Sequence, residues 1–173
     1  MGNNTRIIII EPYNPAWPQE FARIKAHIWP HISGLALGMV HVGSTSVPNL
    51  PAKPIIDIDI IIQSYVVLPQ IVDALDKLGY EHRGDLGIAT REAFQRPVDS
   101  PFMAHHTYVC PQDSPELARH RFFSEYLRQN PVAAAEYAAL KQGLAQRYPN
   151  DIDAYVDGKT EFIQKILHTG GLT

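Results

Sequence analysis

The chain lacks the features that mark secreted and membrane proteins. It has a single cysteine, Cys110, which excludes an internal disulfide and favours a reducing compartment. No segment approaches the roughly 20 consecutive apolar residues needed to cross a bilayer. The apolar run at 7–10 ends at Glu11 and Pro12 and is too short for the core of a signal peptide. We therefore expect a cytoplasmic protein with no membrane partner.

Positive charge is also scarce. Lys and Arg number 15 against 18 Asp and Glu, which gives a formal net charge of −3, and the basic residues are spread along the chain. This distribution argues against duplex nucleic acid as a partner but is compatible with a local phosphate site. Internal repeats, low-complexity tracts and long linkers are absent. At 173 residues, with 45% apolar and 19% charged residues, we expect one domain over 1–173 with a substantial core.

The order of the predicted elements indicates an α+β fold. Branched and aromatic residues predict strands at 7–10, 39–42, 55–62, 80–82, 90–97 and 105–110. Helices are predicted after Asn14, over 67–78, after Ser114, over 131–148 and after Asp151 or Asp153, each of these polar residues being suited to cap a helix. The consecutive helices after the mixed half predict an α/β core over 1–112 and a helical C-terminal part over 113–173.

Two aspartates one position apart are the most informative feature of the chain. Asp57 and Asp59 lie in the apolar strand 55–62, and residues i and i+2 of a strand project from the same face. Two adjacent carboxylates in apolar surroundings repel each other and are costly to bury. A divalent cation removes that cost, and Mg²⁺ commonly takes one or two carboxylates together with phosphate oxygens. The pair therefore predicts a magnesium and phosphate site.

A small polar turn precedes these aspartates. It comprises Gly43, Ser44, Thr45 and Ser46, and it is joined to the strand by a connection that Pro48, Pro51 and Pro54 make stiff and extended. Lys53 lies between the turn and the carboxylates, where it is suited to act as a point charge for a phosphate. His41, just before the turn, is expected to be structural.

The whole stretch 41–60 resembles the GrpB family, and its Gly-Ser pair followed by Asp-x-Asp in an apolar strand resembles the nucleotidyltransferase (polymerase beta-like) superfamily. Other segments match the GrpB family in the same order along the chain: Pro12-Tyr13-Asn14-Pro15-x-Trp17, Gly79-Tyr80, Arg91-x-x-Phe94, His105-His106-x-Tyr108-Val109, Tyr126-Leu127-Arg128 and Tyr155-x-x-x-Lys159. The resemblance implies a nucleotidyltransferase-like mixed β-sheet with flanking helices and a C-terminal helical layer. It also implies that Gly43 lets the backbone approach a triphosphate, that Ser44 bonds a phosphate oxygen, and that Asp57 and Asp59 hold Mg²⁺.

One element of the superfamily pattern is missing. Active members usually place a third carboxylate on a neighbouring strand, yet the strand at 104–110 offers only His105 and His106. Because side chains alternate across a strand, at most one of these two histidines is expected to face the site. That histidine could act as base or ligand, Glu92 or Asp99 could supply the acid from further away, or the site could bind nucleotide without efficient transfer.

Basic residues beyond the turn are further candidates for phosphate or acceptor contacts. The family pattern favours Arg91, Arg128 and Lys159, with Arg121 and Lys141 as weaker candidates; the alternative for each is a solvated surface position.

Together these features predict a Mg²⁺-dependent protein that binds a nucleoside triphosphate and transfers a nucleotidyl group to a small-molecule or protein acceptor. The alternative is a non-catalytic nucleotide-binding or regulatory module linked to coenzyme A metabolism. The nucleotide, the acceptor and the oligomeric state stay open. The geometric expectation is definite: both aspartates converge near the Gly43–Ser44 backbone, with His105 or His106 facing them.

Overall fold

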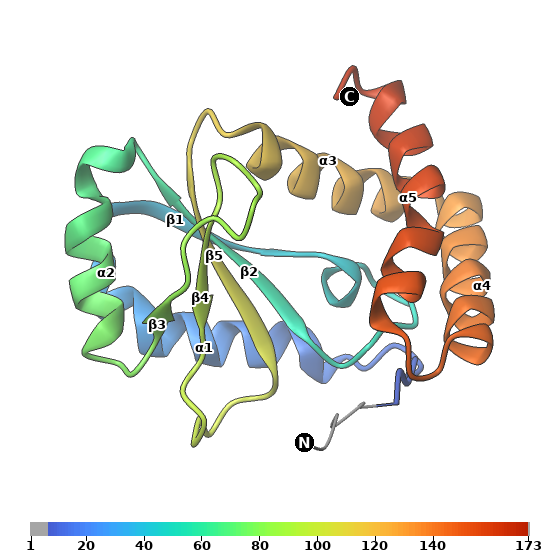
Figure 1. Ribbon diagram of the computed structural model, residues 1–173, viewed down its shortest axis with the longest axis horizontal. Coiled ribbons are helices and arrows are strands. Elements are labelled where there is room, and N and C mark those ends of the chain that lie inside the picture. Colours follow the sequence, from blue (N-terminus) through green and yellow to red (C-terminus); the bar gives the residue numbers. More distant parts are fainter. Residues whose placement is uncertain (1–6, 173) are drawn as a thin grey trace.

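A mixed five-stranded sheet forms the centre of the molecule (Figure 1). The structure is a computed structural model that describes residues 7–172. Its strands lie in the order β1-β2-β5-β4-β3, with β2 and β5 parallel and all other neighbours antiparallel. The strands are β1 (Ala36–Val42), β2 (Ile56–Ile62), β3 (Glu81–His82), β4 (Glu92–Gln95) and β5 (His105–Pro111).

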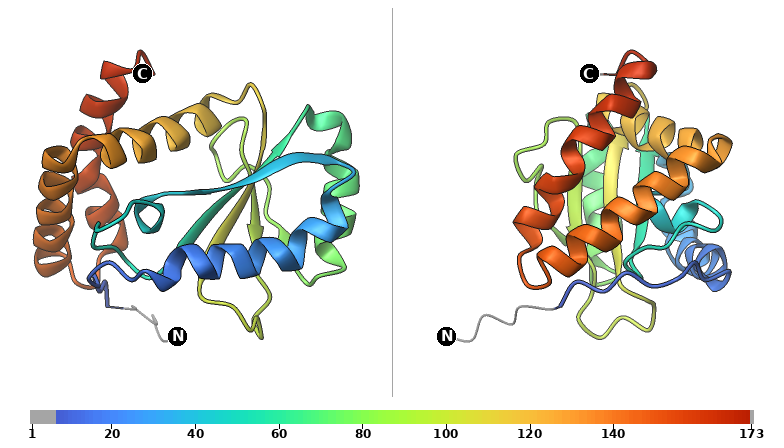
Figure 2. Two further views of the ribbon diagram at one scale, coloured as in Figure 1. Left: turned by 180° about the vertical axis from the view of Figure 1, so that it is seen from behind. Right: turned by 90° about the vertical axis from the view of Figure 1, so that its right-hand side faces the viewer.

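Helices cover both faces of this sheet and one of its ends. They are α1 (Ala16–Ile32), α2 (Leu68–Asp76), α3 (Pro115–Gln129), α4 (Pro131–Arg147) and α5 (Ile152–Thr169). Helices α1 and α2 pack on one face, α3 crosses the other, and α4 and α5 stand side by side at the end of the sheet opposite α2 (Figures 1 and 2). The predicted α+β architecture with a C-terminal helical layer is confirmed. None of the helices within residues 7–172 is long and apolar enough to cross a membrane.

Strand β2 separates the main core from the site. Its even-numbered isoleucines, from Ile56 to Ile62, are fully buried and pack with the apolar side of α1 and α2. Burial of one such side chain contributes about 1.5–3 kcal/mol, so this face fixes the register of the strand. The odd-numbered positions, which carry the aspartates, consequently face the opposite side.

The helix starts agree with the capping residues expected from the sequence. The Ser114 hydroxyl accepts a hydrogen bond from the Leu117 amide, and Asp151, rather than Asp153, accepts one from Ala154. The Asn14 side chain accepts a bond from the Ala16 amide at the start of α1. Each contact satisfies an amide that has no partner inside its helix.

The N-terminal strand prediction is wrong. Residues 7–10 form no strand, and an isolated antiparallel bridge joins the next residue, Glu11, to Ala52. Ile8 instead donates its amide to the Pro149 carbonyl and packs against Tyr155, so the run covers the junction of α4 and α5. A short apolar run is suited to such a buried segment as well as to a strand, and periodicity alone cannot separate the two.

Candidate functional site

The two aspartates share one face of β2, as predicted. Val42 and Val40 of β1 are their antiparallel partners, and His106 and Tyr108 of β5 their parallel partners. The two carboxylates differ in exposure: the Asp57 side chain is 31% exposed, whereas that of Asp59 is 0% exposed. Only Asp57 therefore opens directly onto solvent.

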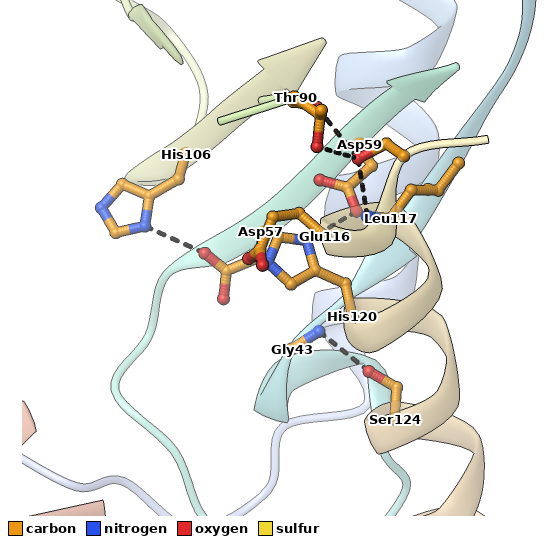
Figure 3. Close-up of polar contacts among 10 residues, drawn as sticks. Gly43, Asp57, Asp59, Thr90, His106, Glu116, Leu117, His120 and Ser124 are labelled. Atoms are coloured by element: carbon orange, nitrogen blue, oxygen red, sulfur yellow. Dashed lines mark hydrogen bonds and ion pairs between the residues drawn. The ribbon is translucent and has the colours of Figure 1, made fainter. Parts of the chain in front are cut away.

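Each aspartate is bonded to a histidine (Figure 3). His106 Nδ1 lies 2.9 Å from Asp57 Oδ1, and His120 Nδ1 lies 2.8 Å from Asp59 Oδ2. Burial alone would lower the pKa of His120, but the hydrogen bond and charge of Asp59 outweigh it and raise that pKa above its usual value. Asp59 Oδ1 is buried and has no hydrogen-bond partner in the described part of the chain.

His105 lies on the opposite face of the sheet. Its Nε2 is 2.8 Å from the Tyr80 hydroxyl and its Nδ1 is 2.7 Å from the Met103 carbonyl oxygen, and burial lowers its pKa. Of the two neighbouring histidines, His106 is thus the one that faces the aspartates. The placement of His105 among core residues gives no support to the catalytic role considered for it.

Helix α3 contributes a polar stripe to the site that was not foreseen. Glu116, His120 and Ser124 are spaced four residues apart, and Figure 3 shows them on the side of α3 that faces β2. The Ser124 hydroxyl accepts a hydrogen bond of 3.0 Å from the Gly43 amide. The spacing i, i+4, i+8 of polar residues was the available sequence signal, because it marks one helix face.

Gly43 allows the turn to approach Asp57 closely. Its φ of 71° lies in the left-handed region, and a Cβ at this position would collide with the Asp57 carboxylate. The turn is held from within by a 2.7 Å hydrogen bond from the Ser46 hydroxyl to the Gly43 carbonyl. Position 43 therefore requires glycine, both because of its backbone conformation and because a side chain has no room beside Asp57.

The other hydroxyls of the turn are engaged with the protein. Thr45 is 1% exposed and donates to the Ile55 carbonyl, while its oxygen also lies 2.9 Å from His41 Nε2. The Ser46 hydroxyl accepts a hydrogen bond from Arg128. Ser46 and Arg128 do not line the cavity described below. Thr45 and Arg128 thus hold the turn in place. His41 also stacks on Phe21, in keeping with a structural role.

Three lysines gather beside the turn. Lys141 of α4 is 2% exposed and donates to the Ser44 hydroxyl at 2.9 Å. Lys53 and Lys159 both lie over the Tyr155 ring, at 5.4 and 4.6 Å from its centroid. None of the ion pairs formed within residues 7–172 includes these lysines.

The pKa values of all three lysines are lower than usual. Burial, followed by repulsion from Lys159 and Lys53, lowers the pKa of Lys141 to about 7. Burial and Lys53 likewise lower the pKa of Lys159 to about 8, and burial lowers that of Lys53. Uncompensated buried cations of this kind are costly to the free protein and favour an anionic ligand.

Asp57 and the three lysines border one cavity of about 720 Å³, a size typical of small-molecule sites, and the enclosed Asp59 lies two residues along the same strand face. Its lining includes Gly43, Ser44, Asp57, His106 and His120, together with all three lysines and Arg91. Glu92 and Asp99 do not line it: Glu92 bonds His82 and Asp99 is exposed. Apart from Asp57, the acid that lines the cavity is Glu116, which is paired with Arg119 at 2.9 Å.

The donor set suits a hard divalent cation with few protein ligands. Asp57 and Asp59 each keep one carboxylate oxygen that bonds no histidine, and that of Asp59 is the orphaned buried atom. Within residues 7–172, no cluster of three or more Asp, Glu, His or Cys side chains is arranged to hold a metal. A cation here would depend on water or phosphate oxygens for its remaining ligands, which is the usual situation of Mg²⁺ in phosphate chemistry.

Comparison with known proteins places this geometry in a family. Residues 7–169 match the model of the family described as GrpB protein. UPF0157 protein YqkA of Bacillus subtilis is 38% identical over 156 residues, which are 88% of this chain and 44% of that protein. Dephospho-CoA kinase of Mycolicibacterium paratuberculosis is 28% identical over 170 residues, or 84% of this chain and 41% of that enzyme. The chain thus spans less than half the length of either relative.

Solved structures agree on the fold. The crystal structure of the conserved protein GrpB from Enterococcus faecalis is 34% identical, with a TM-score of 0.83 over 93% of this chain and 96% of that chain. The MgGTP-bound structure of the Cid1 poly(U) polymerase is 13% identical, with a TM-score of 0.57 over 80% of this chain and 45% of that chain. The chain belongs to the GrpB family and has a nucleotidyltransferase-like fold.

Proposed function

We propose that the protein binds a nucleoside triphosphate with Mg²⁺ and transfers its nucleotidyl group to an acceptor hydroxyl. The observation that carries the proposal is an aspartate pair that faces three lysines without ion-pair partners around one cavity. Asp57 at the cavity surface and the enclosed Asp59 beside it on β2 form an acidic floor, and the three lysines form a basic wall. None of the ion pairs within residues 7–172 joins floor to wall. A magnesium–triphosphate complex carries the cation that the floor needs and the anion that the wall needs.

The triphosphate would lie between the Gly43–Ser44 turn and the lysine wall. Lys141 already orients the Ser44 hydroxyl, and Lys159 and Lys53 flank the same space over Tyr155. Lys ammonium groups serve phosphates as point charges, and a water-excluding position strengthens them. Asp57 and Asp59 would hold the cation, which when bound neutralises charge on the transferring group.

The reaction is an in-line displacement. The acceptor hydroxyl oxygen forms a bond to the α-phosphorus as the bond from that phosphorus to the α–β bridging oxygen breaks. The bridging oxygen keeps the electron pair and leaves on pyrophosphate, and the hydroxyl proton passes to solvent water. The floor, turn and wall contribute positioning and charge rather than covalent chemistry.

Titration of ATP, GTP, CTP and UTP in the presence of Mg²⁺ tests binding. We expect at least one nucleotide to bind and the double variant Asp57→Asn/Asp59→Asn to bind it about 100-fold more weakly, as expected for loss of two charged contacts. Circular dichroism checks that the variant is folded. Absence of binding by all four nucleotides, or unchanged affinity in the variant, would refute the proposal.

A non-catalytic role is the second candidate. The similarity to dephospho-CoA kinase over 41% of that enzyme suggests a nucleotide-binding or regulatory module linked to coenzyme A metabolism. The lack of an acid on β5 beside the aspartates favours the same reading, since His106 and Tyr108 occupy the two adjacent positions. Nucleotide binding without pyrophosphate release across a broad acceptor panel would support this role. Pyrophosphate release that disappears in the aspartate variants would eliminate it.

A further inference from the structure

Arg91 is an unpaired cation at a different part of the cavity from the lysine wall. Its guanidinium carbon lies 4.2 Å from the centroid of the Tyr108 ring. Its Nε is buried without a hydrogen-bond partner, and none of the ion pairs within residues 7–172 includes it. A guanidinium stacked on an aromatic ring keeps the N–H groups at its edge free for an anion. The neighbouring Arg119 is different, because Glu116 already neutralises it.

The sheet register separates Arg91 from the lysines. Arg91 directly precedes β4, whose Ala93 pairs with Tyr108, and Tyr108 in turn pairs with Asp59. Arg91 therefore lies on the β5–β4 side of the aspartates, whereas Lys53 precedes the start of β2. The electrostatic effects of these cations are separate as well. The charge of Arg91 acts to lower the pKa of Tyr108 and His120, whereas the lysines lower the pKa of one another.

The separation of Arg91 from the lysines matches the geometry of an in-line transfer. The entering hydroxyl and the departing pyrophosphate occupy opposite sides of the α-phosphorus. If the pyrophosphate portion lies at the lysine wall, the acceptor must approach from the Arg91 side. Resting on the function proposed above, we infer that Arg91, stacked on Tyr108, binds an acceptor that carries a phosphate or carboxylate group beside its reactive hydroxyl.

The surroundings favour a small acceptor. A cavity of about 720 Å³ that also holds a nucleoside triphosphate leaves limited room, and the chain has a net charge of −3 with no extended basic surface in its sequence. The planar fork of N–H groups on a guanidinium matches the paired oxygens of a phosphate or carboxylate. The acceptor is therefore an anionic hydroxy compound of low molecular weight, and Arg91 is the residue that selects it.

Inorganic phosphate is the first probe, because its binding does not depend on the identity of nucleotide or acceptor. Calorimetric titration of the free protein is expected to reveal two phosphate sites. Lys141→Met should remove one, and Arg91→Gln should weaken the other about tenfold, as expected for loss of a charge-assisted bidentate contact. Arg91→Lys, which keeps the charge without the fork, should give an intermediate loss, and thermal melting confirms that each variant is folded.

The outcomes separate this inference from the proposed function. Phosphate binding that Arg91→Gln leaves unchanged refutes the inference even if nucleotides bind at the lysine wall. Loss of one phosphate site in Arg91→Gln supports the anion site even if no nucleotide binds, in which case the proposed function fails alone. Pyrophosphate release with glycerol 3-phosphate and glycerate, but not with glycerol, would support the acceptor role; equal release with the neutral glycerol would overturn it.

Discussion

The floor and the wall of the cavity handle buried charge in opposite ways. On the floor, Asp57 and Asp59 each bond a histidine, and Asp59 is completely enclosed. On the wall, Lys53, Lys141 and Lys159 contact hydroxyl, carbonyl and aromatic groups, repel one another and form no ion pair within residues 7–172. The floor is thus largely preorganised, whereas the wall is in a costly state that an anion would relieve. The difference indicates which part gains most from ligand binding.

Gly43 lies where floor and wall meet, and its replacement should have the largest effect. Gly43→Ala would drive a Cβ into the Asp57 carboxylate at a positive φ, so we expect a loss of about 2–4 kcal/mol in unfolding free energy. Urea denaturation measures this loss. Gly38→Ala in β1 is the control, because a Cβ there meets nothing within 4 Å. Equal stability of the two variants would contradict the account of the turn.

A lysine of the wall can be replaced without loss of folding stability. Lys141→Met removes a buried, crowded cation, and we expect about 100-fold weaker nucleotide binding together with about 1–2 kcal/mol greater stability of the free protein. Fluorescent nucleotide titration and urea denaturation measure the two effects. Lys77→Met, at an exposed position after α2, should change neither. A variant that loses stability and keeps affinity would show that Lys141 is structural.

Replacement of the two histidines that bond the floor aspartates should affect stability to different degrees. His120→Ala leaves the enclosed Asp59 carboxylate without a partner, so we expect a loss of about 2 kcal/mol. His106→Ala should lower the unfolding free energy by only about 0–1 kcal/mol. The His106 side chain is 51% exposed and that of Asp57 is 31% exposed, so solvent screens this pair. Denaturation of the single variants, and of His120→Ala combined with Asp59→Asn, tests this. Failure of Asp59→Asn to recover part of the loss would exclude the buried charge as its cause.

The pH dependence of stability should separate wall from floor with a smaller effect. The lysines have pKa values near 10.5 when unfolded but about 7 and 8 for Lys141 and Lys159 when folded, so the unfolded chain binds more protons above pH 7. Their destabilisation is fully present below about pH 6 and is relieved as pH rises through 7 and 8 toward the unfolded value. His120, with its raised pKa, acts in the opposite direction. The difference between wild type and Lys141→Met in denaturation at each pH isolates the lysine contribution, and parallel profiles would contradict it.

The sequence permits accurate prediction of the floor because its parts are neighbours in the chain. Turn and strand lie within residues 41–62, and strand alternation alone places Asp57 and Asp59 together. The same rule predicted that one histidine of the pair 105/106 faces them, but it could not choose between them because the phase of β5 depends on its pairing with β2. Local periodicity thus determines faces, and tertiary pairing determines which face is which.

The remainder of the site depends on how helices dock. His120 and Ser124 reach residues 61 and 81 positions away, and Lys141 reaches Ser44 across 97 positions. No local pattern fixes the rotation of α3 and α4 against the sheet, so the sequence favoured Arg128 over Lys141. One signal was available: Tyr137, Lys141 and Ala145 share a buried face of α4, where a lysine without an acidic partner is rare.

We regard floor and wall as complementary halves of one magnesium–triphosphate site. Calorimetric titration of ATP, with and without Mg²⁺, on wild type and on Asp57→Asn tests it most directly. The account predicts that Mg²⁺ tightens ATP binding to wild type by about tenfold or more and that Asp57→Asn removes most of this gain while Mg²⁺-free binding at the wall persists. Equal enhancement by Mg²⁺ in wild type and Asp57→Asn would contradict it.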